Sequence, residues 1–192
     1  MSDEPVSEDS EKPKAEAKAE KPARPARKEP ETPTAPVMLD ERGEALSGVL
    51  PKVFSDFEIE YSAAMDEVVA IVKPKDIPEV CRIAKEDERL NFDYLRSISV
   101  VDYEERLEVN YHLFSLENRH KMVIKTSVSP DDPHVPTATG VWRGADWHER
   151  EGHDLFGVVF DDHPNLKPLV LYEGFEGFPG RKSFPFHEYE EW

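Results

Sequence analysis

The segment from 147 to 185 constrains the fold of this chain most, because it mixes aromatic, acidic, basic and glycine residues more densely than any other part of the sequence. Asp146 is suited to cap the N-terminus of a helix, with Glu149 three residues later as its capping-box partner. Gly157 is suited to end that helix. The spacing therefore predicts a helix between Asp146 and Gly157.

One face of this predicted helix carries an unusual combination of side chains. At about 100° per residue, it holds Trp147, Arg150, Glu151, Asp154 and Leu155. Arg150 and Asp154 are spaced to form an i,i+4 ion pair. An ordinary amphipathic helix places its charges opposite its aromatic side chain. Two interpretations stay open: a solvated, salt-bridged surface helix, or a face that lies against a polar, partly buried neighbour where ion pairs set orientation.

The residues after this helix are predicted to be mostly irregular. Residues 157–160 form a short apolar run that suits a strand, and residues 161–165 are dense in turn formers. Two prolines and a glycine between 178 and 185 exclude long regular structure. The C-terminal part is therefore expected to be an irregular arm.

These residues also form a recognisable pattern. Its members are Trp147, Glu149, Arg150, Glu151, Asp154, Gly157, Phe160, His163, Pro164 and Leu166, followed by Gly177, Pro179, Arg181, Lys182, Phe184 and Pro185. The pattern resembles the signature of a family of respiratory proteins, the thirty-kilodalton (C-type) subunits of the proton-translocating NADH–quinone oxidoreductase, respiratory complex I. Upstream, 101–103 and 107–115 are also similar to that family, so the resemblance covers about residues 50–187. Pro168 and Gly180 depart from it, since a basic residue and a leucine are usual there, and the arm is expected to pack differently at both.

The resemblance implies a peripheral-arm subunit that supports electron transfer from NADH to quinone. It implies no catalytic, cofactor-binding or metal-binding residue in this chain, with FMN, iron–sulfur clusters and quinone held by partner subunits. The implied partners are the large quinone-site subunit and the small iron–sulfur subunit, at the cytoplasmic side of the bacterial inner membrane. The chain would reach the membrane only through them. The resemblance also implies that Arg181 and Lys182 face a partner, and that the Arg150–Asp154 pair fixes the helix that presents them.

Two rival interpretations stay open. Within the same family, the equivalent subunit of a membrane-bound hydrogenase or of a reduced-deazaflavin (F420) dehydrogenase looks similar over the signature. From a different class, a hydrolase would use paired carboxylates for acid/base work, drawn from Glu149, Glu151, Asp154, Asp161 and Asp162. Arg150 beside the first three favours their ionised form, which is the wrong direction for a general acid.

Other site chemistries lack the required spacing. A zinc-protease motif places its second histidine four residues after the first, whereas His148 and His153 are five apart and turn to different faces of a helix. The glycines between 174 and 180 are separated by aromatic residues and a proline, unlike a phosphate-cradling loop. The lone Cys81 excludes an internal disulfide or a Cys-ligated cluster and suits a reducing compartment.

Charge and hydropathy exclude further classes of partner. Residues 37–192 carry 32 acids and 17 bases within a chain of net charge −17. Such a domain repels nucleic-acid phosphates and anionic membrane surfaces. No run approaches the roughly 18 apolar residues of a membrane span.

The chain divides by composition into a tail and a folded domain. Residues 1–36 contain seven prolines and no aromatic residue, and are predicted to be disordered, with no signal peptide. Residues 37–192 are predicted to form one domain of the family resembled above, including the arm. Apolar periodicity predicts helices at 40–50, ending at Pro51, and at 73–88, and strands at 57–61, 68–72, 92–101, 106–115 and 121–129, with a helical turn at 136–142. The expected fold class is α+β, mainly an antiparallel sheet with helices packed on one face, plus an irregular C-terminal arm and a disordered N-terminal tail.

Overall fold

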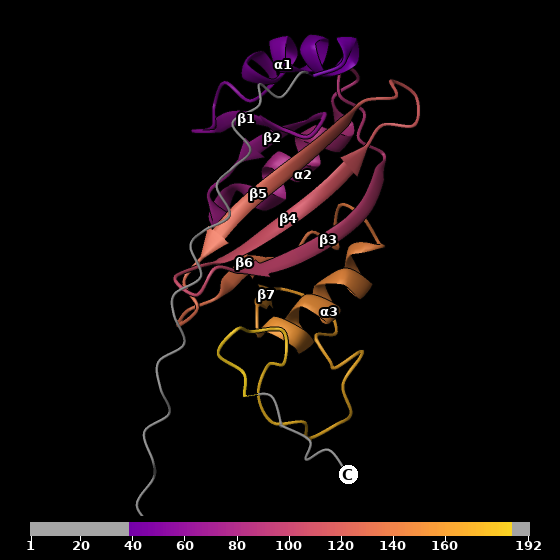
Figure 1. Cartoon of the computed structure of the whole chain (residues 1–192). Coiled ribbons are helices and arrows are strands. Elements are labelled where there is room, and N and C mark those ends of the chain that lie inside the picture. Colours follow the sequence, from indigo (N-terminus) through magenta and orange to yellow (C-terminus); the bar gives the residue numbers. More distant parts are fainter. Residues whose placement is uncertain (1–38, 186–192) are drawn as a thin grey trace, which may run out of the picture. The chain divides into compact units, whose positions relative to one another are not determined.

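A computed structural model describes residues 39–185 of the chain (Figure 1). The tail predicted to be disordered, residues 1–36, lies outside the described residues. So does 186–192, the end of the predicted folded domain.

A five-stranded mixed sheet organises the described part. In spatial order its strands are β1 (Glu60–Ala64), β2 (Glu67–Ile71), β5 (Lys121–Val128), β4 (Leu107–Phe114) and β3 (Tyr94–Asp102). The β2–β5 pair is parallel and the other pairs are antiparallel. The predicted meander of three long strands is confirmed in β3, β4 and β5.

The helices and a small second sheet complete the fold. They are α1 (Glu41–Val53), the 3₁₀ turn η1 (Pro74–Asp76), α2 (Ile77–Glu86), β6 (His134–Pro136), α3 (Ala145–Phe156) and β7 (Val159–Asp161). β6 and β7 pair in parallel. Figure 1 shows α2 behind the sheet and α3 beside β3. Among residues 39–185, every helix is too short or too polar to cross a membrane.

The two faces of the sheet differ sharply in polarity. Alternate residues of β4, from Leu107 to Leu113, are fully buried in the core shared with α1 and α2. The opposite face carries ion pairs: Arg96 Nη1 lies 2.6 Å from Glu67 Oε1, and Lys125 Nζ lies 3.1 Å from Glu108 Oε1. The prediction of an α+β fold with its helices on one sheet face is therefore confirmed.

Three element boundaries differ from expectation. Helix α1 passes through Pro51 and ends at Val53, because Leu50 and Phe54 are buried and hold its last turn in place. The strand expected from 57 begins at Glu60, because the partner strand ends at Ile71, which lies opposite Glu60. The turn expected over 136–142 is preceded by β6 and shortens to one closed by Trp142 N donating to Ala138 O at 3.0 Å.

Candidate functional site

Helix α3 packs closely on the edge of the sheet and supports the arm, which we define as residues 162–185. Gly152 makes this approach possible, because a Cβ atom there would lie 3.0 Å from Val100 Cγ2 of β3. The buried residues of the helix are Ala145, Glu149, Gly152 and Asp154. The face predicted from Trp147 to Leu155 is therefore mixed, since Trp147 is 61% exposed and Asp154 is 7% exposed.

Arg150 and Asp154 bind the backbone of the arm. Arg150 donates from Nε to Lys167 O and from Nη2 to Pro168 O, both at 3.0 Å. Asp154 Oδ2 accepts from the three consecutive backbone N–H groups of residues 169–171 at 3.1, 2.8 and 2.7 Å. We call these contacts the arm clasp. The predicted Arg150–Asp154 ion pair is wrong, because both side chains are engaged by the arm instead.

The electrostatics of the clasp favour an ionised Asp154. Burial alone would raise the pKa of Asp154, but the N–H donors of Leu171, Val170 and Leu169 outweigh it, and the pKa lies below its ordinary value. The arm clasp therefore holds a charged carboxylate at neutral pH. Of the two interpretations of this helix face, contact with a polar, partly buried neighbour is the correct one, and that neighbour is the chain's own arm.

Glu149 occupies a buried polar pocket on the other side of α3. Its carboxylate accepts from Ala138 N at 2.7 Å and from Thr137 Oγ1, so it joins the helix to the segment after β6. The predicted capping box is wrong, because α3 starts after Gly144 and no side chain caps it within the described residues. Burial raises the pKa of Glu149 to about 7, opposed by the hydrogen bonds from Thr137 and Ala138.

His163 lies beside this carboxylate with its side chain fully buried. The Asn165 N–H donates to His163 Nδ1 at 3.0 Å, which leaves the imidazole proton on Nε2. His163 Nε2 lies 3.2 Å from Asp146 Oδ1 and 3.8 Å from Glu149 Oε2. The signature histidine therefore fastens the start of the arm to α3.

Arg181 closes the arm against the end of α3. Its Nε donates to Phe156 O at 2.7 Å, its Nη1 donates to Pro130 O at 3.3 Å, and its guanidinium carbon lies 4.9 Å from the centre of the Phe178 ring. The expectation that Arg181 faces a partner is therefore corrected, since its donors are bound within the chain.

Lys182 differs from its neighbour. Its backbone N–H donates to Asp102 Oδ2 at 2.8 Å, whereas its side chain is 53% exposed and lies 3.6 Å from Glu104 Oε1. An outward-facing role for the Lys182 ammonium thus stays a prediction.

Two glycines allow the arm to approach the helix end. Gly157 ends α3 as predicted, with φ 73°, and a Cβ there would lie 2.6 Å from the Phe178 ring. Gly180 donates its N–H to Leu155 O at 2.9 Å, and a Cβ there would lie 2.9 Å from that oxygen. Glycine at 180, where the family pattern usually has leucine, therefore belongs to a particularly close contact of the arm.

The remaining signature residues fall into two groups. Phe160 is buried in the core, and Phe184 is half-buried and stacked on Phe175 with ring centres 6.0 Å apart. The prolines at 164 and 185 and the carboxylate of Glu151 are exposed, and Pro179 is half-buried. The structure thus gathers most of the predicted residues around α3 and the arm, but buries some and exposes others.

Sequence reasoning missed several partners of these residues. Thr137 and Ala138 receive Glu149, and Asp102 receives the backbone of Lys182. Asp102 belongs to the stretch 101–103 that resembles the family, so a signal was present there. Nothing in the sequence around Thr137 marks it as a carboxylate donor.

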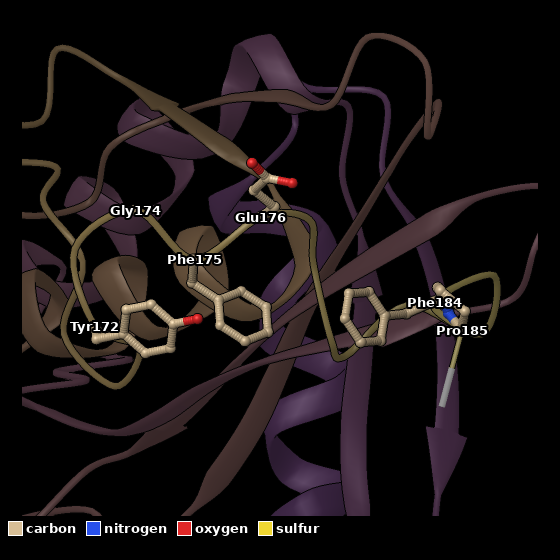
Figure 2. A pocket seen from close by; sticks show the side chains of 6 residues that line it. All are labelled: Tyr172, Gly174, Phe175, Glu176, Phe184 and Pro185. Atoms are coloured by element: carbon tan, nitrogen blue, oxygen red, sulfur yellow. The ribbon is translucent and has the colours of Figure 1, made fainter. Parts of the chain in front are cut away.

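Exposed apolar side chains gather on α3 and the arm. They are Trp147, Val170, Tyr172 and Phe178, with exposed fractions of 61, 58, 71 and 37%. A pocket of about 520 Å³ opens beside them, lined by Tyr172, Gly174, Phe175, Glu176, Phe184 and Pro185 (Figure 2). Within residues 39–185, histidine, cysteine and carboxylate groups do not converge in threes as a metal site requires. The arrangement suits contact with another molecule.

Known proteins with similar sequences share the features of this site. The profile of the family described as the 30 kDa subunit of respiratory-chain NADH dehydrogenase matches residues 70–190. The second C-type NADH-quinone oxidoreductase subunit of Rhizobium meliloti (strain 1021) is 50% identical over 123 residues, which cover 62% of this chain and 67% of that protein.

Two solved structures share the fold. The trypsin-resistant fragment of Nqo5 has a TM-score of 0.54 and 29% identity, and covers 63% of this chain and 98% of the fragment. A chain of the archaeal membrane-bound sulfane sulfur reductase, a respiratory membrane complex, has a TM-score of 0.64 and 25% identity, and covers 73% of this chain and 86% of that one. The profile match over most of the domain, together with a half-identical relative, shows that this chain belongs to the family of the 30 kDa subunit of respiratory-chain NADH dehydrogenase.

Proposed function

We propose that the chain is a peripheral-arm subunit of a proton-translocating NADH–quinone oxidoreductase and that it contributes a docking surface without a redox centre of its own. The arm clasp is the observation that carries this proposal. Arg150, Asp154 and Arg181 are the signature charges, and all three bind the chain's own backbone. The clasp fixes an irregular segment whose apolar side chains remain exposed.

The partners follow from the family and from the chemistry of the surface. The large quinone-site subunit and the small iron–sulfur subunit are the proposed neighbours. They and other subunits would hold FMN, the iron–sulfur clusters and quinone. A segment that exposes Trp147, Val170 and Tyr172 to water is stabilised when a partner covers it. The chain would then lie at the cytoplasmic side of the membrane, held there by its neighbours.

Purification from the native membrane tests this proposal. A tagged full-length chain is expected to bring the large and small subunits with it, in a fraction that oxidises NADH and reduces quinone. A folded chain isolated alone with its own turnover, or with a stoichiometric prosthetic group, would overturn it.

A second candidate within the same fold is supported by the likeness to the sulfane sulfur reductase complex. There the chain would serve a different respiratory membrane complex in the same position. The catalytic subunits that co-purify decide between the two, since a complex without NADH oxidation favours this second candidate.

A further inference from the structure

The pocket on the arm is built mainly from aromatic rings. The Tyr172 and Phe175 ring centres are 5.4 Å apart with planes at 76°, and Phe175 and Phe184 are 6.0 Å apart with planes at 25°. Gly174 and Pro185 complete the wall, and Glu176 supplies the carboxylate (Figure 2). The lining therefore presents three ring faces and one negative charge.

The backbone around this pocket is held from both sides. Asp154 binds the N–H groups of residues 169–171, directly before Tyr172. Gly174 and Gly177 adopt φ values of 88° and 91°, which favour glycine, and a Cβ at Gly177 would lie 3.0 Å from the Phe184 ring. The rings are thus positioned before any partner arrives, which lowers the entropy that binding must offset.

We propose that this pocket receives a basic side chain, an arginine by preference, from a neighbouring subunit. This inference rests on the proposed function, because it requires assembly with other subunits. Aromatic faces attract cations, and a planar guanidinium also stacks on them. The Glu176 carboxylate adds a direct partner for the same charge.

Charge disfavours the other occupants. A second copy of this chain brings a net charge of −17 to an acidic pocket. The segment 186–192, which follows Pro185 directly, brings three glutamates and no lysine or arginine. A basic residue of a partner is the occupant whose charge complements Glu176.

Substitutions in the assembled complex test the inference. Glu176→Gln removes the charge at nearly constant shape, and Phe175→Leu removes a ring. Membranes carrying the tagged chain are washed with increasing NaCl, and the fraction of chain retained with the other subunits is measured. Both variants are expected to bind about two- to fivefold more weakly than wild type. Glu173→Gln, an exposed acid of the same arm outside the pocket lining, is the matched control and is expected to behave as wild type.

A photo-crosslinking residue in place of Tyr172 identifies the occupant. A crosslink to a partner peptide that contains arginine or lysine supports the inference. A crosslink to 186–192 or to a second copy overturns it, as does unchanged retention of Glu176→Gln and of a Phe175→Leu variant whose thermal unfolding matches wild type. Failure of the wild-type chain to co-purify with any subunit would overturn the proposed function as well, so the two failures are distinguishable.

Discussion

Arg150 and Asp154 lie one helical turn apart on α3 and hold the same backbone segment through its two kinds of polar group. Arg150 binds the carbonyls of residues 167 and 168, and Asp154 binds the N–H groups of the next three residues. The two side chains therefore fix both position and direction of the arm as it leaves the helix. A charge pair that sequence spacing assigns to the helix surface is in fact the attachment of an irregular segment.

Asp154→Ala is expected to release the arm while the sheet stays folded. The substitution leaves three N–H groups without their acceptor, at about 1–3 kcal/mol for each that stays buried, so the segment opens to water instead. Hydrogen exchange should become faster at residues 169–171 but not in β4. The abundance of the complex should fall more than the turnover of the complex that survives.

Glu151→Ala is the control for this experiment, because Glu151 is exposed on the same helix. Normal amounts of complex with abolished quinone reduction in Asp154→Ala would contradict a positioning role and indicate direct chemistry.

Arg150→Lys is expected to weaken the arm clasp although the charge is kept. Arginine reaches two carbonyls with one planar group, and its guanidinium carbon lies 5.7 Å from the centre of the Trp147 ring. Lysine lacks this fork, and the expected loss is about 1 kcal/mol. Limited proteolysis within 167–177 should be several times faster than in wild type. Equal cleavage rates would show that charge alone holds the segment.

Glu149 is expected to make stability depend on pH. Its pKa rises from 4.5 in the unfolded chain to about 7 in the folded one, so folding takes up a proton between these values. The stabilisation is complete below pH 4.5 and is lost as the pH rises through about 7. The full effect is on the order of 3 kcal/mol, since one pKa unit corresponds to about 1.4 kcal/mol.

Glu149→Gln isolates this effect because glutamine does not ionise. Urea unfolding of both proteins at pH 5 and pH 8 should show the variant gaining stability relative to wild type at the higher pH. A difference between the two proteins that is the same at both values would refute a buried, proton-holding Glu149.

Gly157→Ala is expected to destabilise the fold by about 2–4 kcal/mol. It places a side chain at positive φ and brings its Cβ to 2.6 Å from the Phe178 ring. Gly48→Ala in α1 is a control of opposite sign, because nothing lies within 4 Å of its Cβ and alanine favours helix by about 0.5–1 kcal/mol. Thermal unfolding of both variants measures the contrast, and equal melting temperatures would exclude close packing of Phe178 on the helix end.

The sequence predicted those parts of the fold that have a period. Alternation of apolar residues along 106–115 and 121–129 marks β4 and β5, and the buried face of β4 follows it residue by residue. The end of α3 at Gly157 was also predictable, because a helix that ends in a left-handed residue favours glycine.

The contacts of the candidate site were not predictable in the same way. The i,i+4 spacing of Arg150 and Asp154 shows that they can reach each other, but not that backbone groups 15 to 18 residues away compete for them. An irregular segment has no period from which its position can be read. The capping box failed for a related reason, since Glu149 found stronger donors in Thr137 and Ala138 across the core.

The order of synthesis gives the contact between Asp102 and Lys182 a further consequence. The two residues are 80 positions apart, and Arg181 reaches back 51 positions to Pro130. A nascent chain still on the ribosome therefore carries a finished sheet without its docking surface, which closes only after residues 181 and 182 have emerged. Products terminated before that point lack this surface, so the fold itself withholds incomplete chains from assembly.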